Sequence, residues 1–552
     1  MQLHVIFFTI FIFFSVFYCQ AQRIPRQERQ AISRLFVHLS ILSHDSLEGR
    51  RAGTTGEQKA ACHIQRTFES SGLRPMGTEG SFLQPFPVPA GKQVSNNTYL
   101  RVNKMHLSAV DFLPLSISGN GRTESVGTLP AVSEKGQAWF LDLVQFLKDQ
   151  PQHPHFDLQA ALLDKAESVR KAGATALLLY STLPIHDTIQ WFDSRYKGST
   201  ANIPIVYIKK GVLEKLWFNP EHSYDISLEV NIEKMHRTAH NVIAYLDRKA
   251  PYTIIIGAHY DHLGRGEDGN SMVRNGQQGI HNGADDNASG TAALLELSHQ
   301  FAQNRTFNTH NLLFIAFSGE ELGLLGSRYF TENPTISLAN VNFMINMDMV
   351  GRIIDSTKRL TIGGYGTSPR WSTIFSSIHE RTLTLTFDSS GTGPSDHTSF
   401  YRKDIPVLFF FTGLHSDYHK PSDDAEKINI EGISAITQLI KNIILQVDGK
   451  EKLVFSKTRD RQTTTNARFT VSLGIMPDYA FAGSGVRIDG VSEGRPAIKA
   501  GLTSGDILIQ IGNFKVTSVE SYMQALSKFK KGDTTEVIIR RNNANITYQI
   551  SF

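Results

Sequence analysis

Apolar runs of strand length alternate with stretches of helical periodicity over residues 236–450. The runs 253–256 and 312–317 are almost continuously apolar, and so are the segments NFMIN and PVLFFF further along the chain. Strands that are apolar on both faces are typical of a sheet that helices cover on both sides. The pattern therefore predicts an α/β core with a buried sheet.

The pattern changes on both sides of this core. Residues 22–110 contain helical periodicity, with a helix expected to open near Thr55, and are assigned to the first part of the same domain. Residues 111–235 have short apolar runs between Gly, Pro and Ser, without a cluster of ligand-type residues, and predict an inserted, mostly-β domain. The polar stretch 451–467 predicts a linker, and 468–552 a separate small unit.

The chain begins with a short apolar segment. Val5–Phe17 is apolar and is followed by small and polar residues, so we expect a signal peptide over 1–21 and a secreted or periplasmic protein. The run is shorter than the about 20 residues that a membrane span needs. A membrane anchor, including a lipoprotein anchored through Cys19, is the alternative. Cleavage leaves Cys62 as the only cysteine, which excludes a disulfide within the chain, and we expect its side chain to be buried.

The overall composition excludes some classes of partner. Hydrophobic residues make up 40% of the chain and charged residues 20%, as in soluble globular proteins. A net charge of +4 over 552 residues is too small to indicate binding to nucleic acid or to an acidic membrane surface. We therefore expect no nucleic acid partner and no stable membrane span.

The first candidate site residues follow the apolar run in TIIIGAHYDH. Open α/β sheets bind their ligands beyond the carboxyl ends of the strands, which is where His259 and Asp261 are expected. His259 is a candidate metal ligand through one ring nitrogen. Asp261 is placed to accept a hydrogen bond from the other ring nitrogen and to fix the tautomer.

Paired carboxylates, Asp285 and Asp286, precede an apolar helical stretch in GADDNASGTAALLELSHQF. Acidic residues at a helix start can simply complement the helix dipole, so this pair alone leaves its role open. Asp286 lies next to the capping residues and is the better candidate to bridge two metal ions.

A second pair, Glu320 and Glu321, follows another apolar run in NLLFIAFSGEELG. Neighbouring side chains point in different directions, so one can bind metal while the other faces the substrate water. A solvated helix start is the alternative. Asp348 ends a third apolar run, where burying a bare carboxylate would be costly, and His419 follows a fourth run. Three further residues are interpreted as supporting or surface residues: His415, Asp396 and His397.

Together, four strand ends deliver two histidines, three carboxylates and one further glutamate. Two divalent ions about 3.5–4 Å apart require such a donor set.

The segments HYDH, GADDNASG, FSGEELGLLGS, NMDMVG and DYHKPSDD together resemble the two-zinc aminopeptidases of metallopeptidase family 28, in clan MH. The resemblance implies a zinc-exopeptidase-like mixed sheet flanked by helices and two Zn²⁺ ions per chain. It implies that Asp286 bridges the ions and that each ion has two further ligands: His259 and Asp348 for one, Glu321 and His419 for the other. It also implies Glu320 as the general base and Asp261 as the partner of His259.

The resemblance implies hydrolysis of N-terminal residues from peptides with a free N-terminus, through a hydroxide that bridges the two metals. A carboxypeptidase on the same metal shell and a one-zinc enzyme similar to glutaminyl cyclase remain alternatives. The insert resembles a protease-associated domain, and GSGVRIDGVSEGRPAIKAGLTSGDILIQIGNFKV resembles a PDZ domain. Such domains bind peptide segments by strand addition, so a peptide or protein ligand is expected, and a non-catalytic peptide-binding protein is a further alternative.

Overall fold

The computed structural model describes residues 25–108, 110–149, 156–196, 199–273, 279–447, 449, 451–458, 471–477, 485–491, 495–517, 519–526, 528–542 and 544–552. The expected signal segment, 1–21, and the alternative lipidation site, Cys19, lie outside these residues, so export stays a prediction. None of the helices in the described part of the chain combines the length and the apolar character that crossing a bilayer needs.

A nine-stranded mixed sheet forms the centre of the core, which confirms the predicted fold class. Its strands, in spatial order, are β1 (Arg74–Pro75), β11 (Ile232–Leu246), β13 (His310–Phe317), β12 (Tyr252–His259), β14 (Val341–Met347), β17 (Val407–Phe411), β15 (Arg359–Gly363) and β16 (Thr384–Phe387), with β2 (Leu83–Val94) paired to β11. The central strands β13, β12, β14 and β17 run parallel to one another. Their carboxyl ends therefore meet at one edge of the sheet.

Helices cover both faces of this sheet because alternate strand residues are apolar on each side. One face packs against α1 (Arg26–Leu42), α2 (Thr55–Ser70), α6 (Gly290–Gln303), α8 (Arg370–Ser376) and α10 (Ile430–Gln446). The other face packs against α7 (Leu325–Glu332) and α9 (His397–Tyr401). Ile254 and Ile256 belong to the first layer and Ile255 to the second, as the two-residue period of a strand requires.

The expected burial of Cys62 is wrong, because its side chain is exposed. The buried positions on α2 include Ala60 and Ile64. Two residues along a helix correspond to a rotation of about 200°, so Cys62 points away from the face that carries Ala60.

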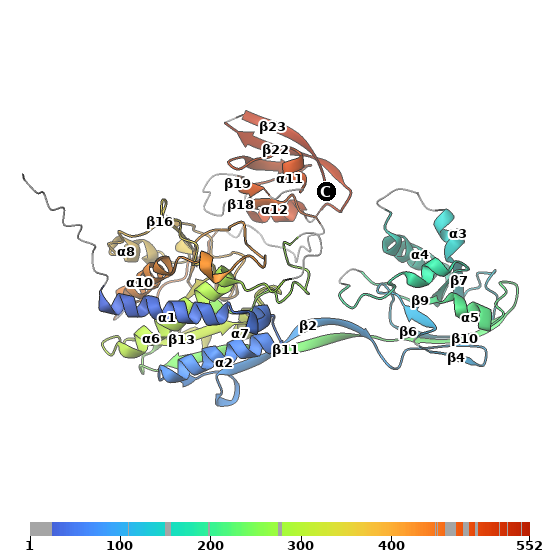
Figure 1. Ribbon diagram of the computed structural model, residues 1–552, viewed down its shortest axis with the longest axis horizontal. Helices are drawn as coiled ribbons and strands as arrows, with labels where there is room; N and C mark the ends of the chain where they lie inside the picture. The colour runs from blue at the N-terminus through green and yellow to red at the C-terminus, as the bar shows by residue number, and fades with distance from the viewer. Residues whose placement is uncertain are drawn as a thin grey trace, which may run out of the picture.

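Strands β2 and β11 continue beyond the core as a two-stranded ribbon that carries the insert (Figure 1). One insert sheet has the order β4 (Met105–Leu107), β3 (Tyr99–Val102), β10 (Tyr224–Val230) and β6 (Gly121–Thr128). The other has the order β5 (Phe112–Pro114), β9 (Ile205–Ile208), β8 (Ala176–Tyr180) and β7 (Ala138–Asp142), and the helices are α3 (Leu143–Lys148), α4 (Leu158–Ala172) and α5 (Lys210–Lys215). Because β3 pairs with β10, the insert sheets include residues before the expected boundary at 111. The likeness to a protease-associated domain stays a prediction.

The C-terminal unit has its own sheet and apolar core. Its elements are β18 (Ile475–Pro477), β19 (Val486–Val491), α11 (Pro496–Lys499), β20 (Ile507–Ile511), β21 (Phe514–Lys515), α12 (Val519–Leu526), β22 (Thr534–Arg541) and β23 (Ala544–Ser551). The first residues of the expected linker pack on the peptidase core. Leu453 is buried there, and the backbone N–H of Thr458 donates to the Tyr401 hydroxyl at 3.0 Å.

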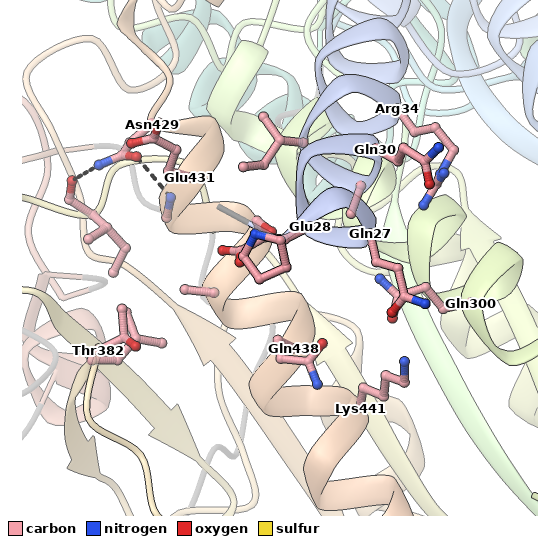
Figure 2. A pocket seen from close by; sticks show the side chains of 18 of the residues that line it. Gln27, Glu28, Gln30, Arg34, Gln300, Thr382, Asn429, Glu431, Gln438 and Lys441 are labelled. Carbon is pink, nitrogen blue, oxygen red and sulfur yellow. Dashed lines mark hydrogen bonds between the residues drawn. The ribbon is translucent and has the colours of Figure 1, made fainter. Parts of the chain in front are cut away.

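A groove of about 890 Å³ lies between α1, the C-terminal end of α6 and α10. Figure 2 shows its polar lining, which includes Glu28, Arg34, Glu431 and Lys441. None of the predicted site residues line this groove, because Asp286 precedes the opposite end of α6. Its side chains carry charges of both signs, so the lining favours no particular charge in a ligand.

Candidate metal centre

The parallel strands bring the predicted site residues to one edge of the core sheet. His259 is the last residue of β12, and Glu320 and Glu321 follow the turn after β13. Asp348 directly follows β14, and His419 lies in the loop after β17. Residues separated by up to 160 positions in the sequence thus meet because their strands are parallel neighbours.

Adjacent aspartates before α6 take different directions. Asp285 turns away from the site, where its Oδ1 accepts hydrogen bonds from the Gly351 backbone N–H at 2.6 Å and the Ser289 hydroxyl at 3.0 Å. The Asp286 side chain instead approaches His259 at 3.3 Å. The structure therefore places Asp286, rather than Asp285, in the site.

Each oxygen of Asp286 faces a different histidine. Oδ1 lies 3.3 Å from Nε2 of His259, which also lies 3.2 Å from Oδ1 of Asp348. Oδ2 lies 3.3 Å from Nε2 of His419, which lies 3.1 Å from Oε2 of Glu321. Two ligands of one tetrahedral zinc ion are separated by about 3.3 Å, given metal–ligand distances near 2.0–2.1 Å. The four separations fit two adjacent metal positions that share Asp286.

His262 is the site residue that the sequence interpretation missed. Its Nδ1 lies 2.7 Å from Oε1 of Glu321 and 3.9 Å from Oδ2 of Asp286, so its donor atoms fall within range of a metal held by these carboxylates. The shorter separation is a hydrogen-bond length, below the about 3.3 Å between ligands of one tetrahedral ion. The geometry suits donation from His262 to Glu321. The second histidine in HYDH was the available signal.

Asp261 is fully buried between His259 and Glu320. Its Oδ1 accepts a hydrogen bond from the Glu320 backbone N–H at 3.1 Å and lies 3.7 Å from Nδ1 of His259. The ring nitrogen lies closer to the Asp261 carbonyl oxygen, at 3.2 Å. The side chain of Asp261 therefore holds the backbone of Glu320, and its carbonyl oxygen contacts the ring of His259.

The surroundings shift the pKa values of the neighbouring residues Glu320 and Glu321 in opposite directions. Burial and the charges of Asp348 and Glu321 raise the pKa of Glu320 well above its ordinary range, against the opposing effect of His259. Burial also favours a raised pKa for Glu321, but the charge of His419 and the hydrogen bond with His262 outweigh it and lower the pKa of Glu321 to about 2. Glu321 is thus an ionised ligand candidate, whereas Glu320 holds a proton readily.

The histidines carry positive charge when no cation balances the carboxylates. Burial opposes protonation of His259, but Asp348 and Glu320 outweigh it and raise the pKa of His259 well above its ordinary value. Glu321 and Asp286 do the same for the pKa of His419. These protons supply the charge that metal ions would supply on binding.

Several buried polar atoms around the site have no hydrogen-bond partner among the described residues. They include Nε2 of His419, Nε2 of His262, Oδ2 of Asp261 and both side-chain oxygens of Asp396. Buried polar groups are normally hydrogen-bonded, so such a cluster indicates a site that is completed by a ligand. The donor chemistry and the spacing both fit metal ions.

His415, Asp396 and His397, which the sequence analysis interprets as supporting or surface residues, do not belong to the two groups of candidate metal ligands. Nε2 of His415 lies 3.2 Å from Oδ2 of Asp285, and the ring of His397 stacks on Phe409 with centroids 4.4 Å apart. Asp396 is fully buried, and burial raises its pKa to about 7. Asp396 and His397 are therefore buried residues rather than surface residues.

Comparison with known proteins identifies two domains. Residues 241–444 match peptidase family M28, and residues 454–552 match the PDZ domain. Aminopeptidase YwaD of Bacillus subtilis is 25% identical over 450 residues, which cover 78% of this chain and 89% of that protein. Leupeptin-inactivating enzyme 1 of Streptomyces exfoliatus is 29% identical over 193 residues, covering 34% and 39%.

Among solved structures, an aminopeptidase from Aneurinibacillus sp. strain AM-1 superimposes with a TM-score of 0.43 at 23% identity, covering 78% of this chain and 97% of that one. The family match spans every candidate ligand, from His259 to His419. Residues 241–444 are therefore a peptidase domain of family M28, a family of hydrolases, and the chain joins this domain to a C-terminal PDZ domain.

Proposed function

We propose that this protein is a zinc-dependent aminopeptidase that holds two Zn²⁺ ions and releases N-terminal residues from peptides. The observation that carries the proposal is Asp286, whose two oxygens each lie 3.3 Å from a different histidine nitrogen. A carboxylate shared in this way is the bridge that a two-metal site requires.

The proposed ligands divide into two sets. His259 and Asp348 would hold one ion, Glu321 and His419 would hold the other, and Asp286 would be shared between them. Imidazole and carboxylate donors suit zinc, which prefers tetrahedral geometry with these distances. When bound, the ions polarise the peptide carbonyl and lower the pKa of a bound water.

Glu320 is proposed to move the proton. It takes a proton from the attacking water and returns it to the leaving amine, and burial raises its pKa, which strengthens it as the acceptor of that proton. Asp261 keeps Glu320 in place through the hydrogen bond from the Glu320 backbone N–H. His262 keeps Glu321 oriented in the same way, as partners of metal ligands commonly do.

The choice of an aminopeptidase over the alternatives draws on the relatives. YwaD of Bacillus subtilis, which is 25% identical to this chain over 450 residues, is an aminopeptidase. Two adjacent groups of donor atoms favour two ions over the single zinc of a cyclase-like enzyme. The PDZ domain is proposed to bind a peptide or protein segment in addition to the substrate.

The test compares the purified protein on aminoacyl amides with a free amine, on their N-acetylated forms and on peptides with a free carboxyl end. Each assay is run with and without a chelator, and zinc content is measured separately by mass spectrometry. We expect two zinc ions per chain and chelator-sensitive release from free-amine substrates alone. Release from acetylated peptides at the carboxyl end would instead establish a carboxypeptidase, and cyclisation of N-terminal glutamine a cyclase.

A further inference from the structure

Arg50 is a fully buried arginine that the assignment of ligands does not use. Its guanidinium group donates hydrogen bonds to four backbone carbonyls among the described residues. Nε donates to Tyr260 at 2.7 Å, Nη2 donates to Gly283 at 3.0 Å, and Nη1 donates to Leu42 and Asn282. These carbonyls come from three separate segments of the chain.

Two of these segments carry metal-site residues. Tyr260 lies between His259 and Asp261, and Gly283 lies three residues before Asp286. A Cβ atom on Gly283 would collide with the backbone oxygen of Asp286 and with the ring of His262. The guanidinium group therefore binds the backbone directly behind the candidate ligands.

The backbone on either side of Arg50 reinforces this contact. The His262 N–H donates to the Arg50 carbonyl at 3.2 Å, and the Gly264 N–H donates to the Gly49 carbonyl at 3.0 Å. Residues 49–51 thus lie alongside residues 262–264, with a parallel bridge between Arg51 and His262. The segment after β12 is therefore bound twice: its Tyr260 carbonyl accepts from the guanidinium group, and its His262 and Gly264 N–H groups donate to the backbone of residues 49–50.

The burial of Arg50 has an electrostatic reason. A buried guanidinium without a compensating charge is costly, yet all of its hydrogen-bond acceptors are neutral carbonyls. Burial lowers its pKa to about 10, so the group stays charged at neutral pH, and the nearby carboxylates Asp286 and Asp261 oppose that lowering. The charge of Arg50 therefore offsets part of the negative charge in the site.

We infer that Arg50 is a positioning residue for the metal centre. Its planar fork joins the segment that carries His259 to the segment that carries Asp286 and holds the ligands in place before the ions bind. The inference rests on the proposed function, because it concerns the affinity of the same site for zinc. It adds a residue from the N-terminal part of the chain, outside residues 241–444 of the family match.

Two variants separate the effect of the planar guanidinium group of Arg50 from the effect of its positive charge. Arg50→Lys keeps the positive charge but loses the planar fork, and Arg50→Gln loses both. Zinc affinity is measured by competition with a chromogenic chelator, and the visible spectrum of the Co²⁺-substituted protein reports the ligand geometry. We expect both variants to bind zinc about 10–100-fold more weakly than wild type, as when partners of metal ligands are removed, and the Co²⁺ spectrum to change.

Arg34→Lys is the matched control. Arg34 lies on α1 and makes two parallel hydrogen bonds with Glu296, at 2.7 and 2.8 Å, in the middle of α6. We expect this control to lower the unfolding temperature while zinc affinity and the Co²⁺ spectrum stay as in wild type. Wild-type affinity and spectrum in Arg50→Lys, or an equal loss of affinity in Arg34→Lys, would overturn the inference.

Hydrogen exchange on the wild-type protein covers the case in which the Arg50 variants do not fold. The chelated protein should still protect the amides of His262 and Gly264, because the contacts with residues 49–50 do not depend on metal. Loss of protection at these amides on chelation alone would overturn the inference. Zinc binding to the wild-type protein is measured first. A wild-type protein that binds no zinc would refute the proposed function rather than the role of Arg50.

Discussion

The peptidase core and the insert both place polar side chains at the carboxyl ends of parallel strands, but the two regions satisfy them differently. In the insert, β8 runs parallel to β7 and β9, and Ser181 after β8 pairs with Nδ1 of His186 at 2.6 Å. Asp187 accepts hydrogen bonds from the Tyr207 hydroxyl at 2.7 Å and from the Lys210 backbone N–H at 3.2 Å.

At the corresponding edge of the core, buried donor and acceptor atoms remain without hydrogen-bond partners. Nε2 of His419 and both oxygens of Asp396 are examples among the described residues. The comparison shows that a strand-end histidine or aspartate does not by itself indicate a functional site. A cluster of such groups that is buried and left unsatisfied does, because the protein must gain the missing interactions from a ligand.

The largest expected effect concerns the carboxylates at the two edges. Glu320→Gln keeps the size of the side chain but removes the base, so kcat should fall by about 10²–10⁴-fold while two zinc ions remain bound. Asp187→Asn in the insert should leave kcat unchanged. Steady-state kinetics and metal analysis of both variants check this prediction, and full activity in Glu320→Gln would remove Glu320 from the mechanism.

The next effect distinguishes the two histidines near Glu321. His262→Ala should keep two zinc ions per chain but weaken zinc binding by about 10–100-fold, because Glu321 loses its hydrogen-bond donor. His419→Ala should retain only one ion at stoichiometric zinc. His186→Ala in the insert should leave zinc binding intact. Metal titration of the three variants measures the number of bound ions. Loss of one ion in His262→Ala but not in His419→Ala would make His262 the metal ligand in place of His419.

A pH effect is expected in the chelated core. Burial raises the pKa of Asp396 to about 7 in the folded protein, above the 3.8 of an ordinary aspartate. The folded state then binds more protons than the unfolded state between these values, so this group makes stability fall as pH rises from about 4 to 7. Asp396→Asn should flatten this part of the profile. Thermal unfolding at a series of pH values, compared between the two proteins, measures the difference, and identical slopes would contradict the prediction.

The smallest effect is expected in the insert, and its sign is opposite. Hydrogen bonds from Ser108 hold the pKa of Asp111 at about 2 when folded. Its contribution is present above the ordinary value of 3.8 and is lost as pH falls toward 2. For a surface interaction this is worth about 1 kcal/mol or less. Unfolding of Asp111→Asn should differ from wild type at pH 6 and converge with it near pH 2, and a constant difference would contradict the assignment.

Much of the core and of the candidate site could be predicted because both depend on local pattern. Apolar runs identified β12, β13, β14 and β17, and His259, Glu321, Asp348 and His419 lie at or beyond the carboxyl ends of these strands. Parallel strands of a covered sheet end at one edge, so His259 and Asp348 could be expected to meet. The ligand roles themselves stay proposals that the experiments above test.

Other features depend on contacts that no local pattern reports. Cys62 is exposed because the packing of α2, rather than its apolar content, decides which face is covered. The sequence favours Asp286 over Asp285 by its place beside the capping residues, but the contact that turns Asp285 away comes from the Gly351 amide, 66 residues from Asp285.

The sequence by itself determined the apolar strands, the order of the site motifs and the residue types available to bind metal, because these follow from composition and period along the chain. Tertiary structure alone decided that His262 contacts Glu321 and that Arg50 lies behind the ligands. The physical reason is separation: Arg50 binds a carbonyl 233 residues away, and such contacts exist only when the whole core has assembled.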